Sequence, residues 1–462
     1  MDFNKLSSMY EEEFVTKVSQ ILKIPSVYED SEEYPYGKPI DDVLETMLQI
    51  AQKDGFLTKN IDGHAAHIEF GEGDELLGIL GHLDVVPAGS DWTTPPFEPT
   101  IRDGRLFARG AQDDKGPVMA AYIAMKILKD KGFKPNKRVR LILGTDEERD
   151  WKGIDYYFKK EEMPTFGFSP DASFPVIHAE KGLLDSYITF PTPFFSGHEV
   201  PAVEFVSLSG GDRLNMVPDQ ARVVLRSKED LETHVNKYAA EHKVSVSVDK
   251  IEETYTITFY GEAAHASKPE TGVNAIIELL TYLLTVPIHS EWKHKLKKIT
   301  EGFNQTDGSG LLLKQSDEDS GALTSNLGSL SIQPDSSLTL GVNVRYPVTS
   351  EGEEIISTLQ SYAEENSGTL EVYDHLKALF MEKNHPFLET LLRVYNEAAG
   401  KNDTPVSIGG ATYARSLHAG VAFGAMFPDS PDTAHQKDEH VRLADMKKAV
   451  EIYAASIYEL AK

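Results

Sequence analysis

Short apolar runs alternate with helical patterns along two separate parts of the chain. The apolar runs cover residues 76–80, 139–143, 166–168 and 421–427, and the helical patterns cover 14–24, 43–51, 118–128, 386–399 and the segment from Asp445. Runs of this length and spacing predict buried strands and amphipathic helices, respectively. Their alternation is typical of a mostly parallel α/β sheet that helices cover on both faces.

The segment between these two parts has a different texture. Strand-like runs rich in β-branched and aromatic residues cover 185–190, 203–208, 221–226, 244–248, 254–260 and 337–345, with helical patterns at 274–284 and 353–365. This pattern predicts a large α+β domain inserted into the first one. Because 462 residues exceed what one hydrophobic core holds, we expect a discontinuous α/β domain of residues 1–182 and 383–462 and an inserted domain of residues 183–382.

Composition excludes several classes of function. The 73 acidic and 46 basic residues give a formal charge of −27, which disfavours binding to nucleic acid or to an anionic membrane. Cysteine is absent, so a disulfide framework, a zinc-thiolate site and a cysteine nucleophile are excluded, and any metal must use histidine and carboxylates. The first 13 residues contain no apolar signal segment and no stretch approaches a membrane span, so we expect a cytoplasmic protein.

A histidine and a carboxylate two residues apart follow the first buried strand. Gly81-His82-Leu83-Asp84 stands directly after residues 76–80. Side chains at i and i+2 of an extended chain point the same way, and a metal-binding histidine usually has its ring held by a carboxylate. Most isolated triplets of this kind are loop residues without a special role, so the interpretation depends on the rest of the chain.

Potential metal ligands also stand at the ends of the other predicted strands and before one helix. They are Asp146-Glu147-Glu148 after 139–143, Asp171 after 166–168, His435 after 421–427, and Asp113-Asp114 before the helix near residue 118. Open α/β sheets bind ligands beyond the carboxyl ends of their strands. Two imidazoles and several carboxylates can therefore converge on one edge of the sheet.

Each of these groups also has an ordinary structural interpretation. The aspartate pair can cap the following helix, and the glutamate pair can be part of a solvated charge run. Asp171 can be a turn residue, and His435 can be an exposed loop histidine. None of these interpretations predicts that such residues occur together at several strand ends, and their joint occurrence favours a metal site.

Several motifs, taken in order, resemble those of the co-catalytic zinc peptidase family, which includes aminoacylase, carboxypeptidase G, succinyl-diaminopimelate desuccinylase and the dipeptidases. The motifs are Gly81-His82-Leu83-Asp84-Val85-Val86-Pro87, Arg109-Gly110-Ala111-Gln112-Asp113-Asp114-Lys115-Gly116, Asp146-Glu147-Glu148 and His435-Gln436-Lys437-Asp438-Glu439. The segment Gly409-Gly410-Ala411-Thr412-Tyr413-Ala414-Arg415 is similar to that of PepV-type bacterial dipeptidases. The resemblance extends from the first helix to residue 439.

The resemblance implies a catalytic centre with two divalent metal ions. It assigns His82 and Asp171 to one ion, Glu148 and His435 to the other, Asp113 to a bridge between both, Asp84 to holding the His82 ring, and Glu147 to general acid/base catalysis. Two ions that share a carboxylate can activate a bridging water and polarise the scissile carbonyl. A site of histidines and carboxylates favours Zn²⁺ by affinity, and Mn²⁺ or Co²⁺ also fit.

The inserted domain would act as a lid that contacts the substrate. The segment 261–267 resembles the lid histidine motif, which implies that His265 stabilises the oxyanion; without the resemblance it is an ordinary loop histidine. Arg345 can bind a substrate carboxylate, or it can be an edge-strand arginine paired with a surface acid. The resemblance adds Asn215 and Arg415 as substrate-binding residues. A lid of this length in PepV-type relatives supplies the histidine from the same chain, so we expect a monomer.

These inferences predict a dipeptidase that hydrolyses unblocked dipeptides. The alternatives are an N-acyl amino acid amidohydrolase of the same family and a non-catalytic metal-binding relative. The presence of Glu147, for which a binding protein has no need, argues against the last of these. The motifs do not specify the side-chain preference of the substrate.

Overall fold

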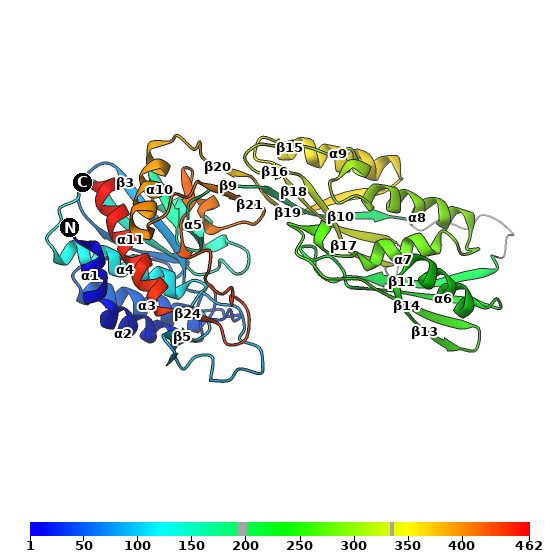
Figure 1. The fold of residues 1–462 in the computed structure, drawn as a ribbon, viewed down its shortest axis with the longest axis horizontal. Helices are drawn as coiled ribbons and strands as arrows, with labels where there is room; N and C mark the ends of the chain where they lie inside the picture. Colours follow the sequence, from blue (N-terminus) through cyan, green and yellow to red (C-terminus); the bar gives the residue numbers. More distant parts are fainter. Residues whose placement is uncertain (192–200, 333–336) are drawn as a thin grey trace. The chain divides into compact units, whose positions relative to one another are not determined.

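The computed structural model describes residues 1–191, 201–332 and 337–462. The chain divides into two compact units (Figure 1). The first unit consists of Met1–Ala179, Leu379–Ser407 and Thr412–Lys462, and the second of Glu180–Ala378 and Ile408–Ala411. Within the described ranges, no helix is both long enough and apolar enough to cross a membrane.

The first unit is an α/β domain. Its helices are α1 (Phe3–Met9), α2 (Glu11–Leu22), α3 (Lys38–Lys53), α4 (Lys115–Asp130), α5 (Lys152–Lys160), α10 (Pro386–Ala399), the 3₁₀ turn η3 (Tyr413–Ser416) and α11 (Leu443–Ala461). Its strands are β1 (Leu57–Ile61), β2 (Ala65–Phe70), β3 (Leu76–His82), β4 (Thr100–Arg102), β5 (Arg105–Phe107), β6 (Arg138–Gly144), β7 (Phe166–Ser169), β8 (Ala172–Ser173), β9 (Ile177–Glu180), β20 (Leu379–Phe380), β21 (Val406–Ile408), β22 (Gly420–Ala422), β23 (Ala425–Met426) and β24 (His440–Arg442).

The main sheet of this unit has parallel strands at its centre and antiparallel strands toward its edges. The strand order is β1-β2-β6-β3-β7-β22-β9-β20, and β21 pairs with β9. β3 runs parallel to β6 and β7, and β22 runs parallel to β7, whereas β1–β2, β2–β6 and β22–β9 are antiparallel. The predicted fold class, a mostly parallel α/β sheet, is confirmed. The ends of β3, β6 and β7 consequently lie at one edge, where ligands bind in such sheets.

Apolar cores cover both faces of this sheet. All seven residues of β3 are buried, as expected for a central parallel strand. One core joins the sheet to α2, α3, α4, α10 and α11, and a separate core joins it to α5 and η3. The start of α4 packs closely on the end of β3, because a Cβ at Gly81 would collide with the side chains of Val118 and Asp114. The glycine before His82 therefore brings the start of α4 next to the histidine.

The predicted strand 421–427 is wrong in its extent. The segment forms two short strands in different sheets: β22 pairs with β7, and β23 pairs with β8. Between them Gly424 has a φ of +75°, a left-handed conformation that favours glycine, and a Cβ there would collide with the ring of Phe174. Because the segment is apolar throughout, its sequence pattern does not show where the first strand ends and the second begins.

The second unit is an α+β domain. Its helices are α6 (Leu231–His242), η1 (Pro269–Thr271), α7 (Ala275–Leu283), α8 (Ser290–Phe303), η2 (Ser309–Leu311) and α9 (Gly352–Glu365). Its strands are β10 (Gly182–Phe190), β11 (Val203–Gly210), β12 (Gln220–Ser227), β13 (Ser245–Ile251), β14 (Thr254–Tyr260), β15 (Ser316–Asp317), β16 (Gly321–Ala322), β17 (Thr324–Ile332), β18 (Leu338–Tyr346) and β19 (Thr369–Leu376).

The large sheet of the second unit is antiparallel. Its order is β13-β14-β12-β11-β17-β18-β10-β19. Burial alternates along β10 and β12, so one face of the sheet packs on a core and the other face is more exposed. The helices α6, α7, α8 and α9 contribute the rest of that core. The prediction of a separate α+β domain is thus confirmed.

Candidate metal centre

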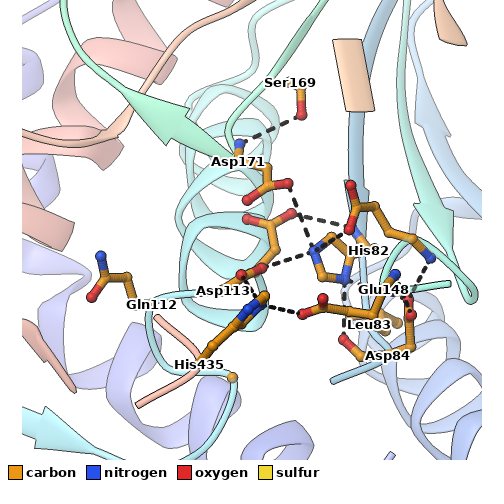
Figure 2. Close-up of polar contacts among 12 residues, drawn as sticks. His82, Leu83, Asp84, Gln112, Asp113, Glu148, Ser169, Asp171 and His435 are labelled. Carbon is orange, nitrogen blue, oxygen red and sulfur yellow. Dashed lines mark hydrogen bonds and ion pairs between the residues drawn. The ribbon is translucent and has the colours of Figure 1, made fainter. Parts of the chain in front are cut away.

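Two overlapping groups of potential metal ligands lie at the carboxyl edge of the first unit's sheet (Figure 2). One group is His82, Asp113 and Asp171, and the other is Asp113, Glu148 and His435; within each group, the ligand atoms lie within 4.8 Å of one another. His82 ends β3, and Glu148 and Asp171 follow β6 and β7. Asp113 precedes α4, and His435 lies in the loop before β24. The structure thus brings all five predicted ligands together.

The Asp113 carboxylate faces both imidazoles (Figure 2). Its Oδ1 lies 3.0 Å from His82 Nε2, and its Oδ2 lies 3.0 Å from His435 Nε2. His435 Nε2 is also 2.9 Å from Glu148 Oε1, and His82 Nε2 is 3.8 Å from Asp171 Oδ2. A carboxylate with one oxygen toward each histidine is the arrangement expected of a ligand that bridges two cations.

The electrostatics of the groups also suit cations. Burial, and then the charge of Asp113, raise the pKa of Asp171. Burial raises the pKa of Glu147 well above its usual range, an effect that His82 opposes and Asp171 reinforces. Hydrogen bonds with Asp113 and Glu148 raise the pKa of His435 to about 10. Bound divalent ions would reduce the repulsion among these crowded carboxylates and would take the place of the protons on the histidines. Nitrogen and oxygen donors of this kind suit Zn²⁺, Mn²⁺ and Co²⁺.

The His82 ring is fully buried and fixed from its far side. Nδ1 lies 3.0 Å from the backbone oxygen of Asp84 and 3.4 Å from its Oδ1. Because the carbonyl can only accept a hydrogen bond, Nδ1 carries the proton, and Nε2 is the atom that faces Asp113. Residue 84 therefore orients the ring through its backbone as well as through its side chain.

The Asp84 carboxylate has a second set of partners. Its Oδ1 accepts the backbone N–H of Glu147 at 3.2 Å, and its Oδ2 accepts that of Glu148 at 3.0 Å. These bonds fix the turn after β6 relative to the end of β3. Asp84 thereby links His82 to the two adjacent glutamates.

The two glutamates of this turn have different surroundings. Glu148 belongs to the second ligand group, whereas Glu147 belongs to neither group. Glu147 Oε2 lies 3.9 Å from His82 Nε2, and its side chain is 15% exposed. The Glu147 carboxylate therefore lies next to the ligands and remains partly accessible to solvent.

The two aspartates before α4, joined by a cis peptide bond, also differ. Asp113 lies in both ligand groups, but Asp114 is completely buried and accepts the backbone N–H of His82 at its Oδ2, at 3.1 Å. Among the described residues, Asp114 Oδ1 has no hydrogen-bond partner. Burial raises the pKa of Asp114 well above its usual range.

Three of the predicted substrate-binding and oxyanion residues lie in the second unit. His265 Nδ1 is 2.7 Å from Ser267 Oγ, and the strand-like pairing of His265 with Met216 sets it beside Asn215, whose carbonyl accepts the Ala266 N–H at 2.9 Å. Arg345 is 3% exposed on the interior strand β18, which excludes the alternative of an exposed edge-strand arginine.

The two predicted substrate-binding arginines, Arg345 and Arg415, lie in different units. Arg345 Nε donates to Asn343 Oδ1 at 3.2 Å, and its Nη1 donates to the backbone oxygen of Gly409. Arg415 lies in η3 of the first unit. The segment 409–415, which resembles PepV-type dipeptidases, thus divides between the two units.

Tyr413 and Glu439 are buried near the ligands, and no role was predicted for either. The Tyr413 ring packs edge-on against His82, with ring centroids 6.2 Å apart, and its hydroxyl has no hydrogen-bond partner in the described part of the chain. Glu439 is completely buried although its sequence neighbours are charged. Burial of a glutamate within a charged segment leaves no periodic signal, so sequence patterns do not reveal it.

Comparison with known proteins gives one family and many relatives. The profile described as Peptidase family M20/M25/M40 matches residues 78–459. "Putative dipeptidase YtjP" of Bacillus subtilis (strain 168) is 42% identical over 459 residues, covering 98% of this chain and 98% of the relative. "Putative dipeptidase SH1171" of Staphylococcus haemolyticus (strain JCSC1435) is 38% identical over 458 residues, covering 98% and 97%.

Solved structures of low sequence identity share the fold. The di-peptidase Dug1p of Saccharomyces cerevisiae matches with a TM-score of 0.60 at 13% identity, covering 100% of this chain and 98% of that one. The aminoacylhistidine dipeptidase of Vibrio alginolyticus matches with a TM-score of 0.61 at 15% identity, covering 96% of each chain. These two likenesses concern the arrangement of elements alone.

Proposed function

Because this chain belongs to peptidase family M20/M25/M40 and is a metallopeptidase, we propose that it is a dipeptidase that hydrolyses the peptide bond of unblocked dipeptides. The observation that carries the proposal is the Asp113 carboxylate, with one oxygen 3.0 Å from each of two imidazoles. The relatives that share its full length and are named as dipeptidases support the substrate class.

The chain offers donors for two divalent ions. In this proposal His82 and Asp171 hold one ion, Glu148 and His435 hold the other, and Asp113 is shared. When bound, such ions lower the pKa of water and polarise a carbonyl. The donor set favours Zn²⁺, with Mn²⁺ and Co²⁺ as alternatives that availability in the cell would decide.

Glu147 is the proposed general acid/base. Its carboxylate borders the ligands without belonging to either group, so it can face the substrate. In the proposed reaction Glu147 takes a proton from the attacking water and delivers it to the nitrogen of the leaving amine. Asp84 positions this residue, because its carboxylate binds the backbone of the turn that carries Glu147.

The second unit supplies the remaining proposed contacts. His265 stabilises the oxyanion of the tetrahedral intermediate, and Arg345 pairs with the C-terminal carboxylate of the substrate. Asn215 and, from the first unit, Arg415 assist in binding. A requirement for both a free amine and a free carboxylate would restrict hydrolysis to short peptides. Because the inserted domain is long, as in PepV-type relatives, we propose that His265 acts at the metal centre of its own chain and that the monomer is active.

A panel of substrates tests this assignment against an acyl amino acid hydrolase. The enzyme, loaded with Zn²⁺, Mn²⁺ or Co²⁺ in parallel, is assayed with unblocked dipeptides and with the N-acetyl and N-succinyl derivatives of the same amino acids. We expect hydrolysis of the dipeptides only, because acylation removes the amine. Activity confined to the acylated compounds would reject the dipeptidase assignment.

A further inference from the structure

A buried ion pair lies beside the loop that carries Asp113, outside the ligand groups. Glu439 Oε2 is 2.5 Å from Arg109 Nη1, and both side chains are almost fully buried. Neither residue belongs to the ligand groups described above. Removing two charges from water is costly, and replacing a buried ion pair with well-packed apolar side chains is often neutral or stabilising. The hydrogen bonds of the pair indicate another role.

Glu439 binds the backbone of the loop that carries Asp113. Its Oε1 accepts the N–H of Gln112 at 2.8 Å and that of Asp113 at 3.1 Å. Its Oε2 accepts the N–H of Gly110 at 3.1 Å. The carboxylate thus accepts hydrogen bonds from three backbone N–H groups and from the guanidinium. An apolar or amide side chain at this position could not accept all four of these bonds. Because Glu439 stands four residues after His435, it connects the segments that carry these two ligands.

A second contact joins the same two segments. Gln112 Oε1 accepts the Thr433 hydroxyl at 2.6 Å and the Thr433 N–H at 2.9 Å. The loop residue next to Asp113 is therefore tied to the residue two positions before His435. Two independent sets of hydrogen bonds hold these segments in register.

Arg109 extends the connection to a third segment. Its Nη2 lies 3.4 Å from the carbonyl oxygens of both Pro87 and Ala88. These residues continue the strand end that carries His82. The guanidinium also lies over the ring of Trp92, with its carbon 5.3 Å from the ring centroid. The ion pair thus contacts the segments of three proposed ligands at once.

We propose that Arg109 and Glu439 are positioning residues that hold the His82, Asp113 and His435 segments in place for metal binding. The pair reaches no ligand atom itself and acts through the backbone that carries the ligands. Ligands that are held in position before metal binds lose less conformational freedom on binding. This inference rests on the proposed assignment of the ligands.

Metal binding by the chelator-stripped protein tests the proposal. Zn²⁺ is titrated against a competing chromophoric chelator in the wild type and in Glu439→Gln. Gln keeps the shape of Glu439 but presents an amide where N–H groups need an acceptor. Removing such outer partners of metal ligands typically weakens metal binding about 10- to 100-fold. We expect a loss of this size, with turnover of the variant recovering as the metal concentration rises.

Glu69→Gln is the matched control. Glu69 pairs with the buried Arg140 at 2.6 Å on β2 and β6 and does not contact the ligand segments. The Glu69→Gln variant should bind Zn²⁺ with the affinity of the wild type. Arg109→Lys keeps the charge but loses the planar guanidinium with its several N–H donors, so it should also weaken Zn²⁺ binding. If Glu439→Gln does not fold, the Zn²⁺ affinity of Arg109→Lys tests the proposal instead. Unchanged affinity in the folded variants, or an equal loss in Glu69→Gln, would overturn the proposal. A wild type that does not bind two ions would instead refute the proposed function.

Discussion

The adjacent residues Glu147 and Glu148 should respond differently to the same conservative substitution. Glu148 Oε1 lies 2.9 Å from His435 Nε2 and belongs to a ligand group, whereas the Glu147 carboxylate belongs to none. The backbone N–H groups of both bind Asp84, so replacing either side chain with Gln leaves the turn held. The comparison therefore separates the chemistry of the two carboxylates from the geometry of the turn.

The expected magnitudes follow from these positions. Glu147→Gln removes the group that carries the proton, which contributes about 10²- to 10⁴-fold in kcat, or about 2.7 to 5.4 kcal/mol. Its metal content should remain that of the wild type. Glu148→Gln replaces a charged donor with a neutral one, so it should lose metal on dialysis and regain part of its activity when metal is added.

The assay measures metal content by mass spectrometry and kcat with an unblocked dipeptide on the same dialysed samples. A control without catalytic role, Glu69→Gln, should match the wild type in both measurements. A kcat of Glu147→Gln within tenfold of the wild type, or a loss of metal as large as that of Glu148→Gln, would refute the role of Glu147 as general acid/base.

Three further perturbations have defined outcomes. Burial, and then the charge of Arg140, lower the pKa of His67 to about 3; the unfolded chain therefore binds this proton near pH 6.5 and the folded protein does not. The free energy of unfolding should fall as the pH drops from about 6.5 toward 3, by about 2 kcal/mol at pH 5. When it is measured by denaturant titration at several pH values, the free energy of unfolding of His67→Gln should depend less on pH than that of the wild type. Asp84→Asn should lower both metal affinity and kcat, because one acceptor of the turn becomes a donor; wild-type values for both would contradict the role of Asp84. Arg345→Lys should raise KM for dipeptides at least tenfold with a smaller change in kcat, and an unchanged KM would reject its role in carboxylate binding.

Patterns of apolar residues predicted the central strands of the first unit's sheet because those strands are buried almost continuously. The predicted runs 76–80, 139–143 and 166–168 lie within β3, β6 and β7. The predicted bounds of residues 386–399 for α10, and of residues 254–260 for β14 in the second unit, also match. Helix α8 was missed although Trp292, Leu296, Ile299 and Phe303 have the spacing of a buried helical face. Strand β17 contains Ser, Asn and Gly, which disfavour strands, and pairing with β11 and β18 overrides that preference.

The candidate site was predictable where ligands follow strands, because parallel strands end at one edge of the sheet. Sequence spacing does not show which atoms meet, so the hydrogen bond of the Asp84 carbonyl to His82 and the bonds of its carboxylate to the next turn came from the structure. Burial of Glu439 within a charged segment was likewise invisible, since it depends on contacts with the distant loop 109–113.

The number of metal ions needed for dipeptide hydrolysis tests the account most directly. The chelator-stripped enzyme is titrated with Zn²⁺ while hydrolysis of one unblocked dipeptide and its N-acetylated form is followed, with Mn²⁺ and Co²⁺ in parallel. We predict that activity on the free dipeptide rises until two equivalents per chain are bound and that the acetylated form is not cleaved. Full activity without metal or at one equivalent, or cleavage of the acetylated form alone, would contradict the account.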